Sequence, residues 1–257
     1  MLNEAVGLYN SGLSLTAVGV RLGCSCSTLH RLFVKHGVSR RRSSEHLRGK
    51  QSHNRKYTCK AHFFDSITDE AQAYYLGLLL ADGNMTKSSK GVVLYSKDYE
   101  LVVGFKNALN ATNPIDTIER GPYTGYEIRV FDCDLYQGLR ANGCTTCKSH
   151  TVKFPDIPES LTSHLVRGYF DGDGGVGRDK RGYLRMNFRG THAMLSSISA
   201  ILNIQVGTNL NKISLDGGIH RIYYSGTPLC TRIADFMYKD ASVFLIRKHT
   251  IFYGGGL

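Results

Sequence analysis

The sequence lacks the features of a membrane or secreted protein. No apolar stretch approaches the roughly 20 residues needed to cross a bilayer, and no lipidation signal is present. The first residues, 1–4, do not have the basic-then-apolar layout of a signal peptide. The seven cysteines are odd in number and irregularly spaced, which argues against a secreted disulfide scaffold. These absences predict an intracellular protein, in the cytoplasm or an organelle matrix, with no membrane partner.

The cysteines leave one metal-binding alternative. Cys144 and Cys147 form a CxxC pair, and Cys59 with His62 offers two more ligands of the kinds that zinc uses. The two pairs lie far apart in the sequence, and nothing else requires them to meet. Reduced, partly buried thiols are therefore the default interpretation, and a structural zinc site is the alternative.

Acidic residues are in the minority. Lys and Arg number 32 against 21 Asp and Glu, which gives a formal net charge of +11. Such an excess favours a polyanionic partner, and nucleic acid fits better than a membrane. The 42% hydrophobic content is ordinary for a globular protein, and 257 residues suffice for one large or two medium domains with a core.

Residues 1–38 predict a small helical module. Ser14 can cap a second helix that Gly23 ends, and Ser25 or Ser27 can cap a third. A helix, a glycine turn and a helix form the layout of a helix-turn-helix, whose last helix enters the DNA major groove. The alternative is a three-helix cap with a charged face. The third helix carries the residues expected to contact DNA: Thr28, Arg31 and Lys35.

Residues 39–56 predict a basic linker. From 39 to 60 the only acid is Glu45 and large apolar residues are nearly absent, so the segment cannot bury a core. On DNA it would follow the phosphates or lie in a minor groove. A solubilising linker or a nuclear-import signal would have the same composition. The residues expected to contact DNA here are Arg40, Arg41 and Arg42.

Two similar motifs organise the rest of the chain. Each is an apolar run that stops at an acid followed by glycine, YYLGLLLADG at 74–83 and LVRGYFDGDG at 165–174. Small residues stand four apart in each run: Gly77 and Ala81, then Gly168 and Gly172. At helical spacing each pair lies on one face, which lets two helix backbones approach closely.

Asp82 and Asp173 then fall at the C-terminal ends of the two helices, where the helix dipole disfavours a carboxylate. Two such acids side by side repel each other unless a cation lies between them. Gly83 and Gly174 are expected to supply the permissive backbone that ends each helix. The motifs therefore predict a pair of acids around a cation.

Other interpretations of the second motif remain. Residues 172–177 match the dinucleotide pattern G-x-G-x-x-G, but a helix precedes them and a charged turn follows. Asp171 and Asp173 begin like a calcium loop, yet Gly182 stands where a bidentate glutamate belongs. The acids can also be solvated caps on two purely structural helices.

The sequence after each motif repeats one order of elements. The first half predicts a strand at 91–96, a helix at 99–109, strands at 116–120 and 126–131 joined by a turn containing Gly125, and a helix at 135–142. The second half predicts strands and helices at 182–189, 194–202, 209–215, 219–224 and 229–238. The fold class is therefore α+β, a pseudo-twofold pair of αββαββα units at 57–156 and 157–257, after a small all-α domain.

These motifs resemble those of the LAGLIDADG homing endonucleases, and the resemblance covers most of the chain after about Tyr57. It implies a metal-dependent hydrolase that cuts both DNA strands across the minor groove and leaves short 3′ overhangs. It also implies that Asp82 and Asp173 hold Mg²⁺ or Mn²⁺, with the backbone carbonyls of Ala81 and Gly172 completing the shell. Family members are encoded by mobile elements, and without a splicing block on either side of the chain we expect an intron-encoded or free-standing gene.

Family enzymes place basic residues or glutamine beside the acids, and this sequence departs from that pattern. The expected catalytic assistants are Lys97 and Arg189, with Lys148 and Lys248 as further candidates. The predicted strands also carry residues suited to the major groove: Arg120, Arg129, Arg185, Asn187 and Arg221.

The sequence thus predicts a monomeric, site-specific endonuclease of double-stranded DNA that needs no obligate protein partner. The alternatives on the same fold are a non-cleaving DNA-binding transcriptional regulator and an RNA-splicing maturase.

Overall fold

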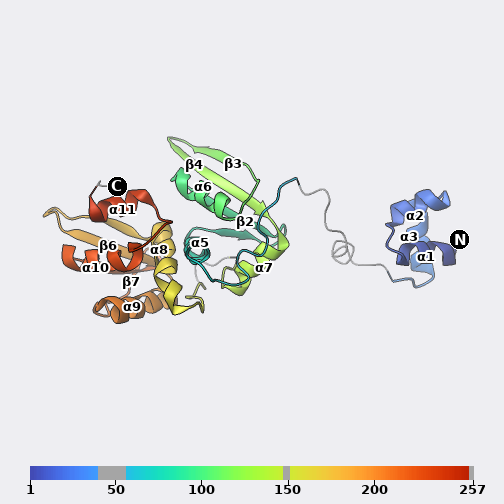
Figure 1. The fold of residues 1–257 in the computed structure, drawn as a ribbon. Coiled ribbons are helices and arrows are strands. Elements are labelled where there is room, and N and C mark those ends of the chain that lie inside the picture. Colours follow the sequence, from blue (N-terminus) through green and yellow to red (C-terminus); the bar gives the residue numbers. More distant parts are fainter. Residues whose placement is uncertain (40–55, 147–150, 255–257) are drawn as a thin grey trace. The chain divides into compact units, whose positions relative to one another are not determined.

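The chain divides into two compact units, Met1–Lys56 and Tyr57–Leu257 (Figure 1). The structure is a computed structural model that describes residues 1–39, 56–146 and 151–254. Among the described residues, no helix combines the length and the apolarity that crossing a membrane requires.

The first unit is built of three helices, α1 (Leu2–Asn10), α2 (Leu15–Leu22) and α3 (Cys26–Lys35). The predicted caps are confirmed: the hydroxyls of Ser14 and Ser25 accept backbone N–H groups of α2 and α3, and Gly23 ends α2 at φ 65°. A small core holds the helices together, and in it the rings of Tyr9 and Phe33 meet edge to face with centroids 5.3 Å apart.

The second unit contains two repeats of one element order. The first repeat comprises α5 (Glu70–Ala81), β1 (Asn84–Thr86), β2 (Gly91–Ser96), α6 (Tyr99–Ala108), β3 (Ile115–Arg120), β4 (Tyr123–Phe131) and α7 (Cys133–Ala141). Its strands form an antiparallel sheet in the order β1-β2-β4-β3. A capping box starts α5, since Asp69 and Gln72 each bond the other's backbone N–H.

The second repeat comprises α8 (Thr162–Asp173), β5 (Gly175–Arg178), β6 (Leu184–Gly190), α9 (His192–Val206), β7 (Ser214–Asp216), β8 (Ile219–Ser225) and α10 (Thr227–Tyr238). A short helix, η2 (Glu159–Leu161), precedes it and α11 (Ile246–Tyr253) follows it. Its sheet has the equivalent antiparallel order, β5-β6-β8-β7. The predicted fold class, a pair of αββαββα units, is confirmed.

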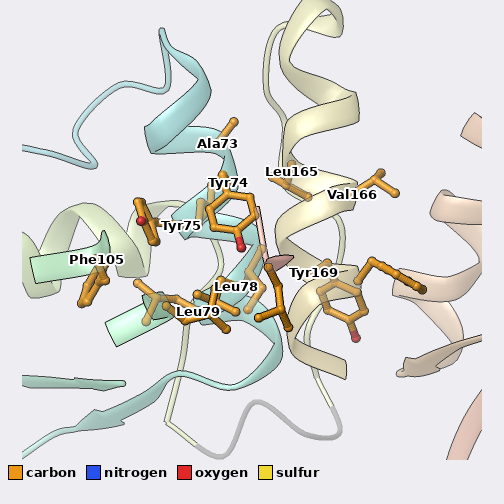
Figure 2. Close-up of a cluster of buried hydrophobic side chains, with 14 of the residues drawn as sticks. Ala73, Tyr74, Tyr75, Leu78, Leu79, Phe105, Leu165, Val166 and Tyr169 are labelled. Atoms are coloured by element: carbon orange, nitrogen blue, oxygen red, sulfur yellow. The ribbon is translucent and has the colours of Figure 1, made fainter. Parts of the chain in front are cut away.

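Helix α5 lies at the centre of the hydrophobic core that the two repeats share. Every residue from 73 to 80 is buried, because the helix packs against α8 on one side and against its own sheet and helices on the other (Figure 2). A helix that is apolar all round is expected to be buried in this way. The position of α5 explains why its sequence shows no polar face.

The second unit differs from the prediction in several details, and no segment was predicted for β1, β5 or α11. Gly125 lies within β4 rather than in the turn, and a side chain there would collide with Tyr95, because a Cβ would lie 2.2 Å from its hydroxyl oxygen. Strand β7 covers only Ser214–Asp216 instead of 209–215. The side-chain amide of Asn211 donates to the carbonyl of Tyr223 at 2.6 Å and so takes an acceptor that a longer β7 would need.

Candidate metal centre and nucleic-acid surfaces

The two motif helices are in backbone contact at the predicted small residues. A Cβ at Gly77 would lie 2.2 Å from the carbonyl oxygen of Leu165, and one at Gly168 would lie 1.9 Å from that of Tyr74. Figure 2 shows α5 and α8 side by side at this seam, with Tyr74 and Leu165 on the facing sides. Only glycine allows this approach, so the seam fixes how far apart the ends of the two helices lie.

The C-terminal ends of these helices bring the two motif acids into one region. Asp82 is the C-cap residue of α5, and Asp173 is the last residue of α8. A Cβ at Gly172, the residue before Asp173, would lie 3.3 Å from Oδ2 of Asp82. Burial raises the pKa of Tyr169, and the charges of Asp173 and Asp82 both raise it further. Both carboxylates therefore act on the same phenol.

The donor chemistry of this region fits Mg²⁺ or Mn²⁺. Magnesium binds through one or two carboxylates and keeps its waters or takes phosphate oxygens, so it does not need a full protein cage. Two acids at adjoining helix ends meet that requirement, and the carbonyls of Ala81 and Gly172 stay predicted ligands. Asp82 is exposed and Asp173 half-buried, which leaves room for a substrate phosphate.

Gly83 and Gly174 end the helices for a different reason from the one predicted. Neither residue has a positive φ, and Gly174 is extended at φ −83°. A Cβ at Gly174 would lie 2.2 Å from the ring of Phe170, and one at Gly83 would lie 2.6 Å from the carbonyl oxygen of Leu79. Both positions require glycine because the chain turns back tightly over its own helix.

A buried charge network supports the end of α8. The ammonium of Lys248 donates to the carbonyls of Phe170, Asp171 and Gly174 at 2.6, 2.9 and 2.6 Å. Burial lowers its pKa to about 8 although Asp171 acts in the opposite direction. A cation in this place satisfies the carbonyls that a helix end leaves free and offsets the helix dipole.

Asp171 joins this network to the neighbouring helices. Its carboxylate accepts hydrogen bonds from the hydroxyl of Tyr74 on α5, the hydroxyl of Tyr238 on α10 and the backbone N–H of Leu245. In the first motif, Leu80 stands at the place equivalent to Asp171. The network therefore supports the helix that carries Asp173, and its Asp171 has no counterpart on α5.

The expected catalytic assistants lie in different places. Lys97 is exposed, and its ammonium lies 4.3 Å from the ring centroid of Tyr123 at the tip of the β3–β4 hairpin. Arg189 is exposed on β6. The ammonium of Lys248 donates its hydrogen bonds to the three carbonyls at the end of α8. Lys148 lies outside the described residues.

The predicted DNA-contacting residues of the strands lie on the faces that the helices leave open. On β6, Arg185, Asn187 and Arg189 alternate with the buried Leu184, Met186 and Phe188. Register places Arg189 opposite Arg221 of β8. Arg129 is exposed on β4, and Arg120 ends β3, but the side chain of Arg120 is not among those described.

In the first unit, Arg31 and Lys35 are exposed on α3, and the hydroxyl of Thr28 is 2.8 Å from that of the capping Ser25. Arg40, Arg41 and Arg42 lie outside the described residues.

The described residues give no support to a zinc site. Cys144 is buried, whereas His62 is exposed and its Nδ1 lies 2.7 Å from Oδ2 of Asp65. Within the described ranges, no three His, Cys, Asp or Glu side chains gather in a way that could hold a metal ion. Cys147 is outside those ranges.

Comparison with known proteins identifies the fold. No protein-family model matches the sequence, and no curated protein matches it either. The homing endonuclease I-WcaI, solved bound to its DNA recognition sequence, is similar with a TM-score of 0.51 and 12% identity over 73% of this chain and 87% of that one. At this identity the likeness shows the fold alone. The second unit has the α+β fold of a homing endonuclease.

Two further solved structures are similar at lower scores. Full-length DUF199/WhiA from Thermatoga maritima gives a TM-score of 0.49 and 11% identity over 76% of this chain and 69% of that one. The LAGLIDADG meganuclease I-AabMI, solved bound to uncleaved DNA, gives 0.47 and 13% identity over 72% and 88%.

Proposed function

We propose that this chain is a site-specific endonuclease of double-stranded DNA, a hydrolase that uses Mg²⁺ or Mn²⁺ held by Asp82 and Asp173. The observation that carries the proposal is the meeting of these two acids at the ends of two helices whose glycines are in backbone contact. The fold is shared with I-WcaI, a homing endonuclease solved on its recognition sequence.

The arrangement of strands supports DNA as the substrate. Each acid is followed within two residues by an edge strand of a sheet, β1 after Asp82 and β5 after Asp173. Each sheet therefore begins at the acid pair and presents an open face beside it. A basic, twisted sheet can enter a major groove, and the net charge of +11 favours a polyanion.

Different residues would bind the cation, bind the DNA and position the acids. Asp82 and Asp173 would bind the cation, and the open faces of the two sheets would bind the duplex on either side of the acids. A bound divalent cation supplies positive charge for the leaving oxygen and makes a water molecule more acidic. Lys248 and Asp171 position Asp173 by fixing the end of α8. One chain supplies both acids and both sheets, so a monomer suffices.

The three-helix unit would add a second DNA contact. Helix α3 exposes Arg31 and Lys35 on one side, while Leu29 and Phe33 are buried on the other. This is the arrangement expected of a recognition helix in a helix-turn-helix.

A second candidate function is a DNA-binding regulator that does not cut. The placement of the basic residues favours it, since Lys248 is occupied by backbone carbonyls and Lys97 lies against Tyr123. Neither ammonium then serves a water or a phosphate in this arrangement.

One experiment separates the two candidates. The full-length protein is incubated with a plasmid library of randomised sites and Mg²⁺, beside Asp82→Asn, Asp173→Asn and the control Asp156→Asn, which alters an exposed acid between the repeats. We expect cleavage by the wild type and the control, and loss of double-strand cleavage in both motif variants. Cleavage unchanged in the motif variants would reject the mechanism, and site-specific binding without cleavage by the wild type would favour the regulator.

A further inference from the structure

The open face of the second sheet is rich in hydrogen-bonding side chains. Strand register places Asn187 opposite Tyr223 and Arg189 opposite Arg221 on this face, and Arg185 opposite Ser225. Counting described side chains only, the face carries three arginines and no acid.

A hollow of about 320 Å³ lies on this face beside Asn187. Gly175 and Gly177 of β5 border it, and they contribute no side chains. The carbonyl oxygen of the Asn187 amide is buried and has no hydrogen-bond partner, while its Nδ2 reaches only the carbonyl of Gly175 at 3.5 Å. The amide therefore keeps unused hydrogen-bonding capacity beside this hollow.

The open face of the first sheet has a different chemistry. Apolar and aromatic side chains predominate on it: Val93, Tyr95, Ile118, Tyr123 and Phe131. Two of the rings pack against glycines, since a Cβ at Gly125 would meet Tyr95 and a Cβ at Gly91 would lie 2.7 Å from Phe131.

Among the side chains of the first face that the structure describes, the charges largely cancel. The guanidinium of Arg129 is paired with Glu127 beside it on the same strand. Asp116, opposite Glu127 in the register, adds a further exposed acid. This face therefore has little capacity to compete for phosphates or guanine edges.

We propose that the two halves of the DNA site are read by different chemistry, an inference that rests on the proposed function. The second sheet reads purine edges, with Arg185 and Arg189 suited to O6 and N7 of guanine and Asn187 suited to N6 and N7 of adenine. The first sheet reads thymine methyl groups through Val93, Ile118 and Phe131. The recognition site is accordingly purine-dependent on one side of its centre and thymine-dependent on the other.

The test uses base analogues that remove one recognition feature at a time. Full-length protein in EDTA, which prevents cleavage, selects duplexes from a random library, and the selected site is then resynthesised. Deoxyuridine replaces thymidine to remove the methyl group, and 7-deazapurines remove N7, each in one half-site only. Binding of each duplex is measured by fluorescence anisotropy.

We expect 7-deazapurines in one half to weaken binding about tenfold and deoxyuridine there to have less than about a twofold effect. The other half should show the reverse order. Arg185→Ala should reduce the 7-deazapurine penalty in its half, since Arg189 and Asn187 remain, and should leave the deoxyuridine penalty in the other half, while Arg140→Ala, an exposed change on α7, leaves both.

Equal penalties in the two halves would overturn the inference while leaving DNA binding intact. So would a selected site in which the half that does not need purine N7 atoms contains no thymines. An Arg185→Ala variant that keeps the full 7-deazapurine penalty would also overturn it. If no duplex is enriched at all, the proposed function itself fails.

Discussion

Replacing Lys248 with methionine is expected to lower the free energy of unfolding of the Tyr57–Leu257 unit by about 3 kcal/mol. The side chain is only 4% exposed, and its ammonium holds three carbonyls at the end of α8. Methionine keeps most of the apolar volume, so the cavity term is small. What is lost is a buried cation, and removing one member of a buried charged network costs about 3–5 kcal/mol.

The adjacent Arg247 provides a matched control in the same helix. Its guanidinium bonds Asp98 at 2.8 and 3.1 Å, but its side chain is 56% exposed, so Arg247→Met should cost about 1 kcal/mol or less. For a unit of this size, the Lys248→Met loss corresponds to a fall in Tm of about 6–12 °C. Urea and thermal unfolding followed by circular dichroism measure both variants. A Lys248→Met protein no less stable than Arg247→Met would refute the structural role of this lysine.

Three further changes test other parts of the account. Gly168→Ala should destabilise the second unit by about 3 kcal/mol because its Cβ would meet the Tyr74 carbonyl. The control Gly177→Ala, whose Cβ would have nothing within 4 Å, should change stability by less than about 0.5 kcal/mol. Equal unfolding midpoints for the two variants would contradict the packed seam. Burial acts to raise the pKa of Glu70, but hydrogen bonds from Ser242 outweigh it and hold this pKa below its ordinary 4.5. The contribution of the Glu70 carboxylate to stability is therefore complete above pH 4.5 and is lost as the pH falls below it. Urea midpoints measured from about pH 6 to about pH 3 should fall less steeply in Glu70→Gln than in the wild type. Parallel curves for the two proteins would contradict this role of Glu70. Arg31→Ala should reduce the slope of log Kd against log salt by about 1, as expected for one lost phosphate contact; a slope equal to that of wild type would remove α3 from the DNA interface.

The sequence was sufficient to predict the order of most elements, though not β1, β5 or α11, and the seam between the motif helices. Each motif pairs small residues four apart, and such spacing leaves few options other than close helix packing. The caps of the first unit were also predictable, because Ser14 and Gly23 act through bonds within a few residues of themselves. Local signals of this kind do not depend on the rest of the fold.

The buried polar network was not predictable in the same way. Arg167 is fully buried and bonds Glu70 and the carbonyls of Met237 and Val243, partners that lie 70 to 97 residues away in the sequence. Lys248 likewise finds its carbonyls 74 to 78 residues away. One signal was present: charged residues inside an otherwise apolar motif helix require buried partners. Their identity depends on tertiary packing.

The roles of the strand residues were predictable only in part. Alternation along β6 was enough to place Arg185, Asn187 and Arg189 on one face. The same reasoning gave Arg129 an equal role, but Glu127 lies beside it and pairs with its guanidinium. Whether a charge on a strand remains available depends on its neighbours on the same face, and these follow from the register.

Binding of Mn²⁺ tests the central claim most directly, because it does not depend on turnover. Electron paramagnetic resonance of the full-length protein with its selected duplex should show protein-dependent Mn²⁺ binding that is weakened at least about tenfold in Asp82→Asn and in Asp173→Asn, since each variant removes one of the two carboxylates. The Asp156→Asn control should bind as the wild type does. Mn²⁺ binding of equal strength in all four proteins would contradict the assignment of a shared cation to these two acids.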